Sequence, residues 1–268
     1  MIEHLRPGAS AANARVALFD FDGTISVIRS GWMEIMIPMM VEILMDLKTG
    51  EREEDLRAIV EEFVGRLTGK QTMYQMIALA EEIEKRGGTP LDPLEYKNQY
   101  LALLNDRIRD ALSELREERC PPEKYLVPGA RALLESLRER GLKMYLASGT
   151  DHVYMREEAR LLDVERYFDG GVFGALDDYK SFSKQMIIER ILHENNLEGE
   201  QLLGFGDGFV EIEEVKKAGG VAVAVASDEV RREGVNAWKR NRLVQAGADL
   251  VIADYRQAEK LLCWLFNE

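Results

Sequence analysis

Two aspartates, one residue apart, form the part of the sequence best suited to chemistry. Asp20 and Asp22 follow a short, mostly apolar run at residues 15–19 and precede Gly23 and Thr24. The carboxylate of Asp20 could attack a phosphorus atom as a nucleophile. The carboxyl group of Asp22 could protonate the leaving oxygen and then deprotonate the attacking water. A capped turn is the alternative interpretation, because Asp and Gly are common turn residues.

A second turn whose residues could bind a substrate follows another apolar run and precedes a helical pattern. It contains Ser148, Gly149 and Thr150. A hydroxyl and backbone N–H groups at the start of a helix form an anion-binding arrangement. We therefore expect this turn, together with Gly23 and Thr24, to bind the phosphate group of a substrate. An ordinary helix N-cap is the alternative interpretation.

Further carboxylates follow a third apolar run, at residues 201–205. Asp207 comes directly after this run, and Glu211 lies four residues later, so both side chains can face one point. Oxygen ligands from Asp20, Asp207 and the Asp22 carbonyl would suit Mg²⁺, with water molecules and a phosphate oxygen completing the octahedron. We therefore predict a Mg²⁺ site beside the first two aspartates.

Two lysines precede the helical pattern that leads to the third run. Either Lys180 or Lys184 could neutralise Asp20 and the charge of a phosphoryl group. A position on the surface is the alternative interpretation for any single lysine.

Each candidate follows an apolar run, so a sheet must position them. Apolar runs and helical patterns alternate after residue 124, which is typical of a parallel sheet covered by helices on both faces. Ligands bind beyond the carboxyl ends of such strands, so the candidates should meet at one edge. The predicted strands are residues 15–19, 142–147, 172–175, 201–205, 221–226 and 248–252, and the predicted helices are residues 130–140, 151–162, 183–194, 209–218, 229–245 and 256–266.

A long helical segment interrupts this α/β pattern. Residues 28–123 read as an inserted all-helical domain, which leaves residues 1–27 and 124–268 as the core. Arg29, near the first linker, could meet a second anionic or hydroxylated part of the substrate. Lys70 lies in a polar turn suited to sugar hydroxyls, for which a plain interhelical turn is the alternative interpretation.

Composition excludes several classes of protein. The 268 residues include 35 Lys and Arg against 48 Asp and Glu, a net charge of −13, which disfavours binding to nucleic acid or an anionic membrane. The two cysteines cannot form a disulfide framework, and we see no secretory signal pattern, so we expect a cytoplasmic protein. A basic stretch that includes Arg231, Arg232, Lys239, Arg240 and Arg242 is expected to be a solvated face.

The motifs, in this order, resemble those of the haloacid dehalogenase superfamily of phosphohydrolases. The resemblance implies a Rossmann-like core, an aspartyl-phosphate formed on Asp20, acid–base catalysis by Asp22, and phosphate binding by Ser148 and the lysine. It also implies Mg²⁺ held by Asp20, the Asp22 carbonyl and Asp207, and a helical cap of the first type between the first two motifs. The residues that carry it are Asp20, Phe21, Asp22, Gly23, Thr24, Ser148, Lys184, Gly206, Asp207, Gly208 and Glu211.

Two details bear on how these roles are carried over. Lys184 starts a helix, as in phosphoserine-phosphatase-like members, so we favour it over Lys180, which remains the alternative. Glu211 stands where Asp is commoner in the family. Its longer side chain would reach the metal directly or through a water molecule.

The expected function is the Mg²⁺-dependent hydrolysis of a small phosphorylated metabolite, most simply a sugar phosphate. A sugar phosphomutase of the same family is the nearest alternative, because both activities use the two aspartates. A dehalogenase is disfavoured, since the resemblance implies that it would lack Asp22. A signalling receiver would lack the insertion at residues 28–123, and the intact Asp20, Asp22 and Asp207 disfavour a non-catalytic phosphate-binding module.

Overall fold

The computed structural model describes residues 2–176 and 179–268. The chain divides into two compact units, one made of residues 1–30 and 111–268 and the other of residues 31–110. The second unit is shorter at both ends than the predicted helical segment 28–123. Its function as a cap stays a prediction.

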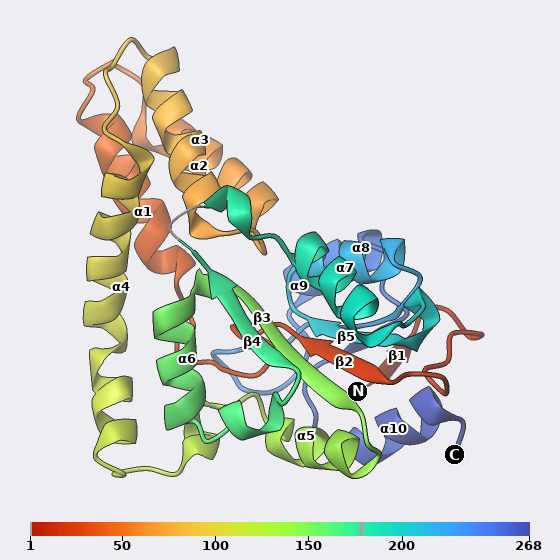
Figure 1. Ribbon diagram of the computed structural model, residues 1–268. Coiled ribbons are helices and arrows are strands. Elements are labelled where there is room, and N and C mark those ends of the chain that lie inside the picture. The colour runs from red at the N-terminus through yellow and green to blue at the C-terminus, as the bar shows by residue number, and fades with distance from the viewer. Residues whose placement is uncertain (1, 177–178) are drawn as a thin grey trace. The chain divides into compact units, whose positions relative to one another are not determined.

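A seven-stranded sheet forms the centre of the first unit (Figure 1). The strand order is β1-β7-β6-β5-β2-β3-β4, and every neighbouring pair is parallel except β1 with β7. This confirms the predicted α/β fold with a parallel sheet. The strands are β1 (Ile2–His4), β2 (Val16–Phe19), β3 (Lys143–Asp151), β4 (Gly171–Ala175), β5 (Leu202–Gly206), β6 (Val221–Val225) and β7 (Leu250–Ile252).

Helices cover both faces of this sheet (Figure 1). Helices α7, α8 and α9 pack on one face, where their apolar side chains join those of β2, β3, β5 and β6 in one core cluster. Helices α5 and α10 lie on the other face, and α6 packs against β3 and β4. Their bounds are α5 (Ala130–Glu139), α6 (His152–Leu161), α7 (Lys184–Asn195), α8 (Phe209–Lys217), α9 (Ala237–Gln245) and α10 (Ala258–Phe266), and short 3₁₀ helices span Pro122–Tyr125, Glu165–Tyr167, Tyr179–Ser181 and Gly199–Gln201.

The central strands are continuous apolar runs because both of their faces are buried. All residues of β2, β5 and β6 are buried. Phe19 at the end of β2 stacks on Phe205 of β5, with the ring centroids 4.5 Å apart. This packing fixes the strand ends that carry the candidate site residues.

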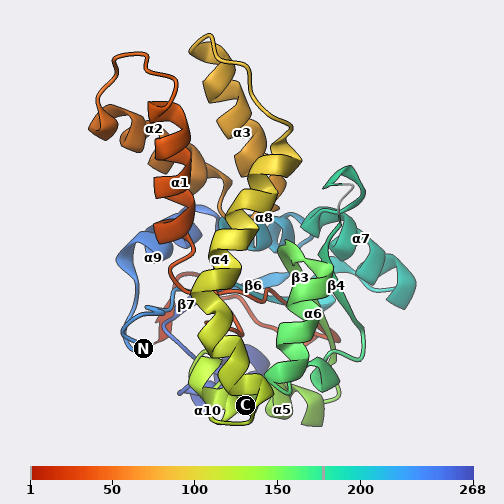
Figure 2. The same cartoon turned by 90° about the vertical axis from the view of Figure 1, so that its left-hand side faces the viewer.

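The second unit consists of helices, as the sequence predicts (Figure 2). Its helices are α1 (Met33–Met45), α2 (Glu53–Leu67), α3 (Thr72–Lys85) and most of α4 (Pro93–Arg116). Met36, Met39 and Met40 are buried, so this part of the methionine-rich stretch packs in a core. The contacts of α2 with α1 and α3 hold the unit together.

The secondary structure differs from the predicted strands and helices near the N-terminus and before α9. The first fourteen residues, which show no clear pattern in the sequence, include β1, which pairs with β7. The predicted helix at residues 229–245 begins only at Ala237. Arg232 and Gly234 have φ values of +56° and +77°, which a right-handed helix does not accommodate.

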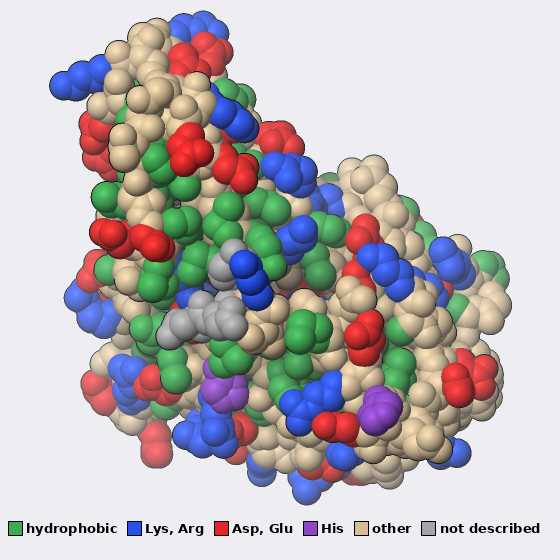
Figure 3. Space-filling model, turned by 45° about the horizontal axis from the view of Figure 1, so that its top comes forward, with side chains coloured by type: hydrophobic (Ala, Val, Ile, Leu, Met, Phe, Trp, Pro, Cys, Tyr) green, Lys and Arg blue, Asp and Glu red, His purple; other side chains and the backbone are tan. Residues whose placement is uncertain are grey.

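Two structural observations concern binding to nucleic acid and to membranes, which the composition disfavours. Basic and acidic side chains are interspersed over the face seen in Figure 3. Within residues 2–176 and 179–268, no helix is both long enough and apolar enough to cross a membrane.

Candidate active site

The candidate site lies where the strand order reverses, at the carboxyl ends of β2 and β5. Phe19 pairs with Phe205 on one side of β2 and with Leu146 of β3 on the other. The backbone N–H of Asp20 donates to the Phe205 carbonyl over 2.9 Å, which continues the ladder past the end of β2. Open parallel sheets bind ligands at such a switch point. The three predicted motifs therefore meet at one edge.

Asp20 is buried and engaged by a lysine. The Nζ atom of Lys184 donates to Asp20 Oδ1 over 2.7 Å, and the same ammonium group contacts the carboxylate of Glu211. The side chains of all three residues are almost completely buried. Burial raises the pKa of Asp20 to about 7, because the attraction of Lys184 only partly offsets desolvation and the charge of Asp207 adds repulsion.

Asp22 is oriented by hydroxyl groups at the carboxyl end of β3, where residues 148–150, predicted to form a turn, continue the strand. The hydroxyl of Thr150 donates to Asp22 Oδ2 over 2.7 Å, and that of Ser148 donates to the same atom over a longer 3.5 Å. Among the described residues, none donates a hydrogen bond to Asp22 Oδ1. Burial raises the pKa of Asp22 to about 6, with Arg29 lowering it and Glu158 raising it. A carboxyl group in this setting can hold a proton close to neutral pH.

Arg29 lies behind Asp22 in a buried ion pair. Its guanidinium donates to both carboxylate oxygens of Glu158 over 2.7–3.2 Å, and its Nε lies 4.0 Å from Asp22 Oδ1. Arg29 is 5% exposed and Glu158 2%. The predicted substrate contact of Arg29 stays a prediction. Sequence reasoning missed Glu158, although it shares the buried face of α6 with Met155 and Ala159.

Gly23 allows Asp207 to approach the turn after β2. Its φ is +72°, and a Cβ atom there would lie 2.1 Å from Asp207 Oδ2. Thr24, the next residue, is fully buried, and its hydroxyl has no hydrogen-bond partner within the described chain. Only glycine gives both the backbone conformation and the space that this approach requires.

A second lysine, Lys239, lies in this site, and the expectation that it belongs to a solvated face is wrong. Its side chain is 12% exposed, and its Nζ donates to Asp207 Oδ2 over 2.6 Å. Glu229 accepts from the same ammonium group. Burial disfavours the ammonium, but the charges of Asp207 and Glu229 outweigh it and raise the pKa of Lys239. No signal in the sequence marked this position, because the predicted helix begins at residue 229 and places Lys239 in its interior, whereas α9 begins at Ala237.

The remaining predicted residues lie in different surroundings. Gly149 is partly buried within β3. Lys180 is exposed in a 3₁₀ helix. Lys70 is exposed in the second unit, in the turn between α2 and α3, with its Nζ 5.7 Å from the centre of the Tyr74 ring. The roles assigned to them stay predictions.

The oxygen atoms of this site suit a hard divalent cation. The predicted ligands are the carboxylates of Asp20 and Asp207, the backbone carbonyl of Asp22 and, directly or through a water molecule, Glu211. In this structure the Glu211 carboxylate contacts the ammonium group of Lys184. Repulsion from Asp207 contributes to the raised pKa of both other aspartates, and a bound cation would relieve it. In the part of the chain that the structure describes, no three His, Cys, Asp or Glu side chains form a metal-binding group. The roles of these residues as metal ligands stay predictions.

A curated protein is similar to part of this chain. Phosphorylated carbohydrates phosphatase of Thermotoga maritima is 29% identical over 147 residues, which is 51% of this chain and 62% of that protein. The match therefore spans less than two thirds of this curated relative.

Solved structures share the fold over almost the whole chain. β-Phosphoglucomutase from Clostridium difficile superposes with a TM-score of 0.64 at 17% identity, covering 95% of this chain and 97% of that one. A predicted phosphoglycolate phosphatase from Haemophilus somnus superposes with a TM-score of 0.60 at 15% identity, covering 93% and 98%. At these identities the likeness establishes the fold alone.

A family model gives the assignment. The model described as haloacid dehalogenase-like hydrolase matches residues 14–219. This span contains the candidate residues Asp20, Asp22, Ser148, Thr150, Lys184 and Asp207. This match extends over more than half of the chain. The protein belongs to the haloacid dehalogenase-like hydrolase family.

Proposed function

We propose that this protein is a Mg²⁺-dependent phosphatase that hydrolyses a small phosphorylated metabolite, a sugar phosphate, through an aspartyl-phosphate. The observation that carries the proposal is that Asp20 and Asp22 have different hydrogen-bond partners. Lys184 holds Asp20, whereas hydroxyl groups orient Asp22 through Oδ2. The Oδ1 atom of Asp22 accepts no hydrogen bond from the residues that the structure describes. One carboxylate is therefore set up as a nucleophile, and the other as a carrier of a proton.

The reaction begins at Asp20. Its ionised Oδ attacks the phosphorus atom, the bond from phosphorus to the ester oxygen breaks, and the proton on Asp22 passes to the leaving oxygen. The buried ammonium of Lys184 favours the ionised form of Asp20 and would face the charge of the phosphoryl group. The alcohol leaves, and the phosphoryl group remains on Asp20.

Hydrolysis then restores both side chains. Asp22, now ionised, takes a proton from a water molecule as that water attacks phosphorus, and the bond from phosphorus to Asp20 breaks. Thr150 keeps the Asp22 carboxylate oriented through both steps by its 2.7 Å hydrogen bond. When bound, Mg²⁺ supplies positive charge that neutralises the phosphoryl oxygens and the excess of carboxylates.

Incubation with a panel of phosphorylated metabolites, with free phosphate as the readout, tests this function. We expect phosphate release that needs Mg²⁺ and disappears in Asp20→Asn, because an amide is a poor nucleophile. Near-normal turnover in that variant would overturn the mechanism. Isomerisation of a hexose 1-phosphate without phosphate release would instead identify a phosphomutase.

The T. maritima relative supports the choice of substrate class, since its name refers to phosphorylated carbohydrates. Lys70 is the residue we propose for contact with sugar hydroxyls, and Arg29 for a second polar part of the substrate. The substrate class is tested by comparing the KM values of sugar phosphates with that of p-nitrophenyl phosphate. A lower KM for the sugars is expected, and equal KM values would contradict it.

A further inference from the structure

Lys239 and Glu229 form a short chain of charges that ends on Asp207. Lys239 lies in the first turn of α9, where the side chain of Asn236 caps the helix by accepting the Lys239 N–H over 3.1 Å. Its ammonium group bridges Asp207 Oδ2 and the Glu229 carboxylate. The exposed fractions are 12% for Lys239, 18% for Asp207 and 15% for Glu229. The three side chains are thus largely removed from solvent.

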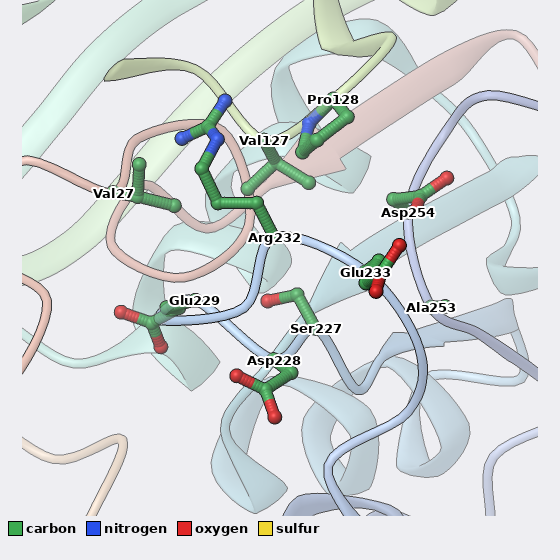
Figure 4. A pocket seen from close by; sticks show the side chains of 10 residues that line it. All are labelled: Val27, Val127, Pro128, Ser227, Asp228, Glu229, Arg232, Glu233, Ala253 and Asp254. Carbon is green, nitrogen blue, oxygen red and sulfur yellow. The ribbon is translucent and has the colours of Figure 1, made fainter. Parts of the chain in front are cut away.

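Hydrogen bonds on both sides of Glu229 fix the segment of residues 227–232 to the rest of the fold. The Ser227 hydroxyl donates to the Gly23 carbonyl over 3.0 Å, and the Arg232 guanidinium donates to the Leu126 carbonyl over 2.7 Å. Figure 4 shows Ser227, Glu229 and Arg232 on this segment, around a cavity of ≈ 10 Å³. That volume is at the limit for one water molecule, so the cavity is not a site for a metabolite. The segment instead holds Glu229 in place.

The ammonium group lies against the turn that follows the catalytic aspartates. A Cβ atom on Gly23 would lie 3.0 Å from Lys239 Nζ, as well as close to Asp207. A buried ion pair is by itself a weak source of stability, because desolvation offsets most of the attraction. The ion pair between Lys239 and Asp207 involves the carboxylate that is predicted to bind the cation, so it can influence that site.

We infer that Lys239 and Glu229 together are positioning residues that orient Asp207 toward the divalent cation. The inference rests on the proposed function. Lys239 holds Asp207 through Oδ2, so Oδ1 is the oxygen that we assign to the cation. A lone ammonium group beside a divalent cation would repel it. Glu229 cancels this charge, so that the pair orients Asp207 without adding net positive charge.

The test replaces the pair at constant net charge. In Lys239→Met/Glu229→Gln, one positive and one negative charge disappear, and only the orientation of Asp207 is lost. Calorimetric titration of the metal-free protein with MgCl₂ should show affinity about 10–100-fold weaker, the usual effect of removing a partner behind a metal ligand. The control is Lys217→Met/Glu214→Gln, which removes an ion pair of 2.6 Å on α8 and should leave the affinity unchanged.

Kinetics separate positioning from a structural role. In the double variant at Lys239 and Glu229, the Mg²⁺ concentration for half-maximal activity should rise by the same factor, while kcat at saturating Mg²⁺ stays within about 3-fold of wild type. Glu229→Gln alone keeps the contact between Lys239 and Asp207, and should also weaken Mg²⁺ because the ammonium charge is then uncompensated. This single variant keeps the inference testable if the double variant does not fold.

The outcomes distinguish the two proposals. If Asp207→Asn binds Mg²⁺ as tightly as wild type, the proposed metal site is wrong and the inference fails with it. If Asp207→Asn loses Mg²⁺ but the variants at Lys239 and Glu229 bind it normally, the inference alone is overturned. Weaker binding in all three variants supports both.

Discussion

Replacing Asp20 by Asn should abolish activity and at the same time stabilise the metal-free protein. The structure shows why the two effects go together. Asp20 is 7% exposed, and its pKa is raised from 3.8 to about 7 by burial, with repulsion from Asp207 and Asp22 adding to the effect of burial. The ionised carboxylate of Asp20, the proposed nucleophile, therefore destabilises the fold. Asn resembles the neutral form, and Lys184 keeps its contact with Glu211.

The magnitude follows from the pKa. The difference between about 7 and 3.8 is roughly three units, and at ~1.4 kcal/mol per unit it sets an upper limit of ~4 kcal/mol. Because the pKa in the folded state is the higher one, wild type is penalised above about pH 4 and fully so above about pH 7. Its stability should rise as the pH falls through this window. The advantage of Asp20→Asn should shrink by more than half between pH 8 and pH 5.

Thermal unfolding followed by circular dichroism in the presence of EDTA measures this difference. Each kcal/mol corresponds to about 2–4 °C in Tm for a chain of this size. The control is Asp106→Asn, whose carboxylate is 70% exposed and paired with Arg109. An exposed pair contributes about 0–1 kcal/mol, so this Tm should change little. Saturating Mg²⁺ should stabilise wild type more than Asp20→Asn.

Two results would refute the reasoning. One is an Asp20→Asn protein less stable than wild type at pH 8 without metal. The other is a stability difference that does not change between pH 8 and pH 5. Either result would mean that the carboxylate of Asp20 is well stabilised in the fold, against the burial and repulsion described above.

Three further predictions concern the residues around Asp20. Asp22→Asn should lower kcat by about 10²–10⁴-fold, the usual effect of losing an acid–base group, and a full rate in steady-state assays would remove its role. Gly23→Ala places a Cβ atom 2.1 Å from Asp207 Oδ2, so calorimetry should show weakened Mg²⁺ binding, whereas unchanged binding would contradict the close approach. Glu158→Gln removes the charge of the carboxylate that pairs with the buried Arg29 guanidinium and should cost ~3–5 kcal/mol in urea unfolding, while the exposed Glu157→Gln should cost less than about 1 kcal/mol. Equal losses in these two variants would refute the importance of the buried pair.

The parts of the fold with a strong local pattern were predictable. β6 is a run of five buried apolar residues, and its central position follows from that pattern. β1 has only three residues and gains its structure from pairing with β7, so no local pattern marks it. The segment before α9 carries helical composition, but Arg232 and Gly234 adopt positive φ values in the folded chain. Contacts elsewhere in the fold, such as that of Arg232 with the Leu126 carbonyl, decided its course.

The sequence by itself determined which residue types the site contains and which strand ends carry them. Asp20, Asp22 and Asp207 follow apolar runs, and the rules of parallel sheets bring the ends of such runs to one edge. Only the tertiary structure decided which charges surround them. Lys239 reaches Asp207 from 32 residues away, and Glu158 reaches Arg29 from 129 residues away. No spacing in the sequence encodes these pairs, because they depend on how α6 and α9 pack against the sheet.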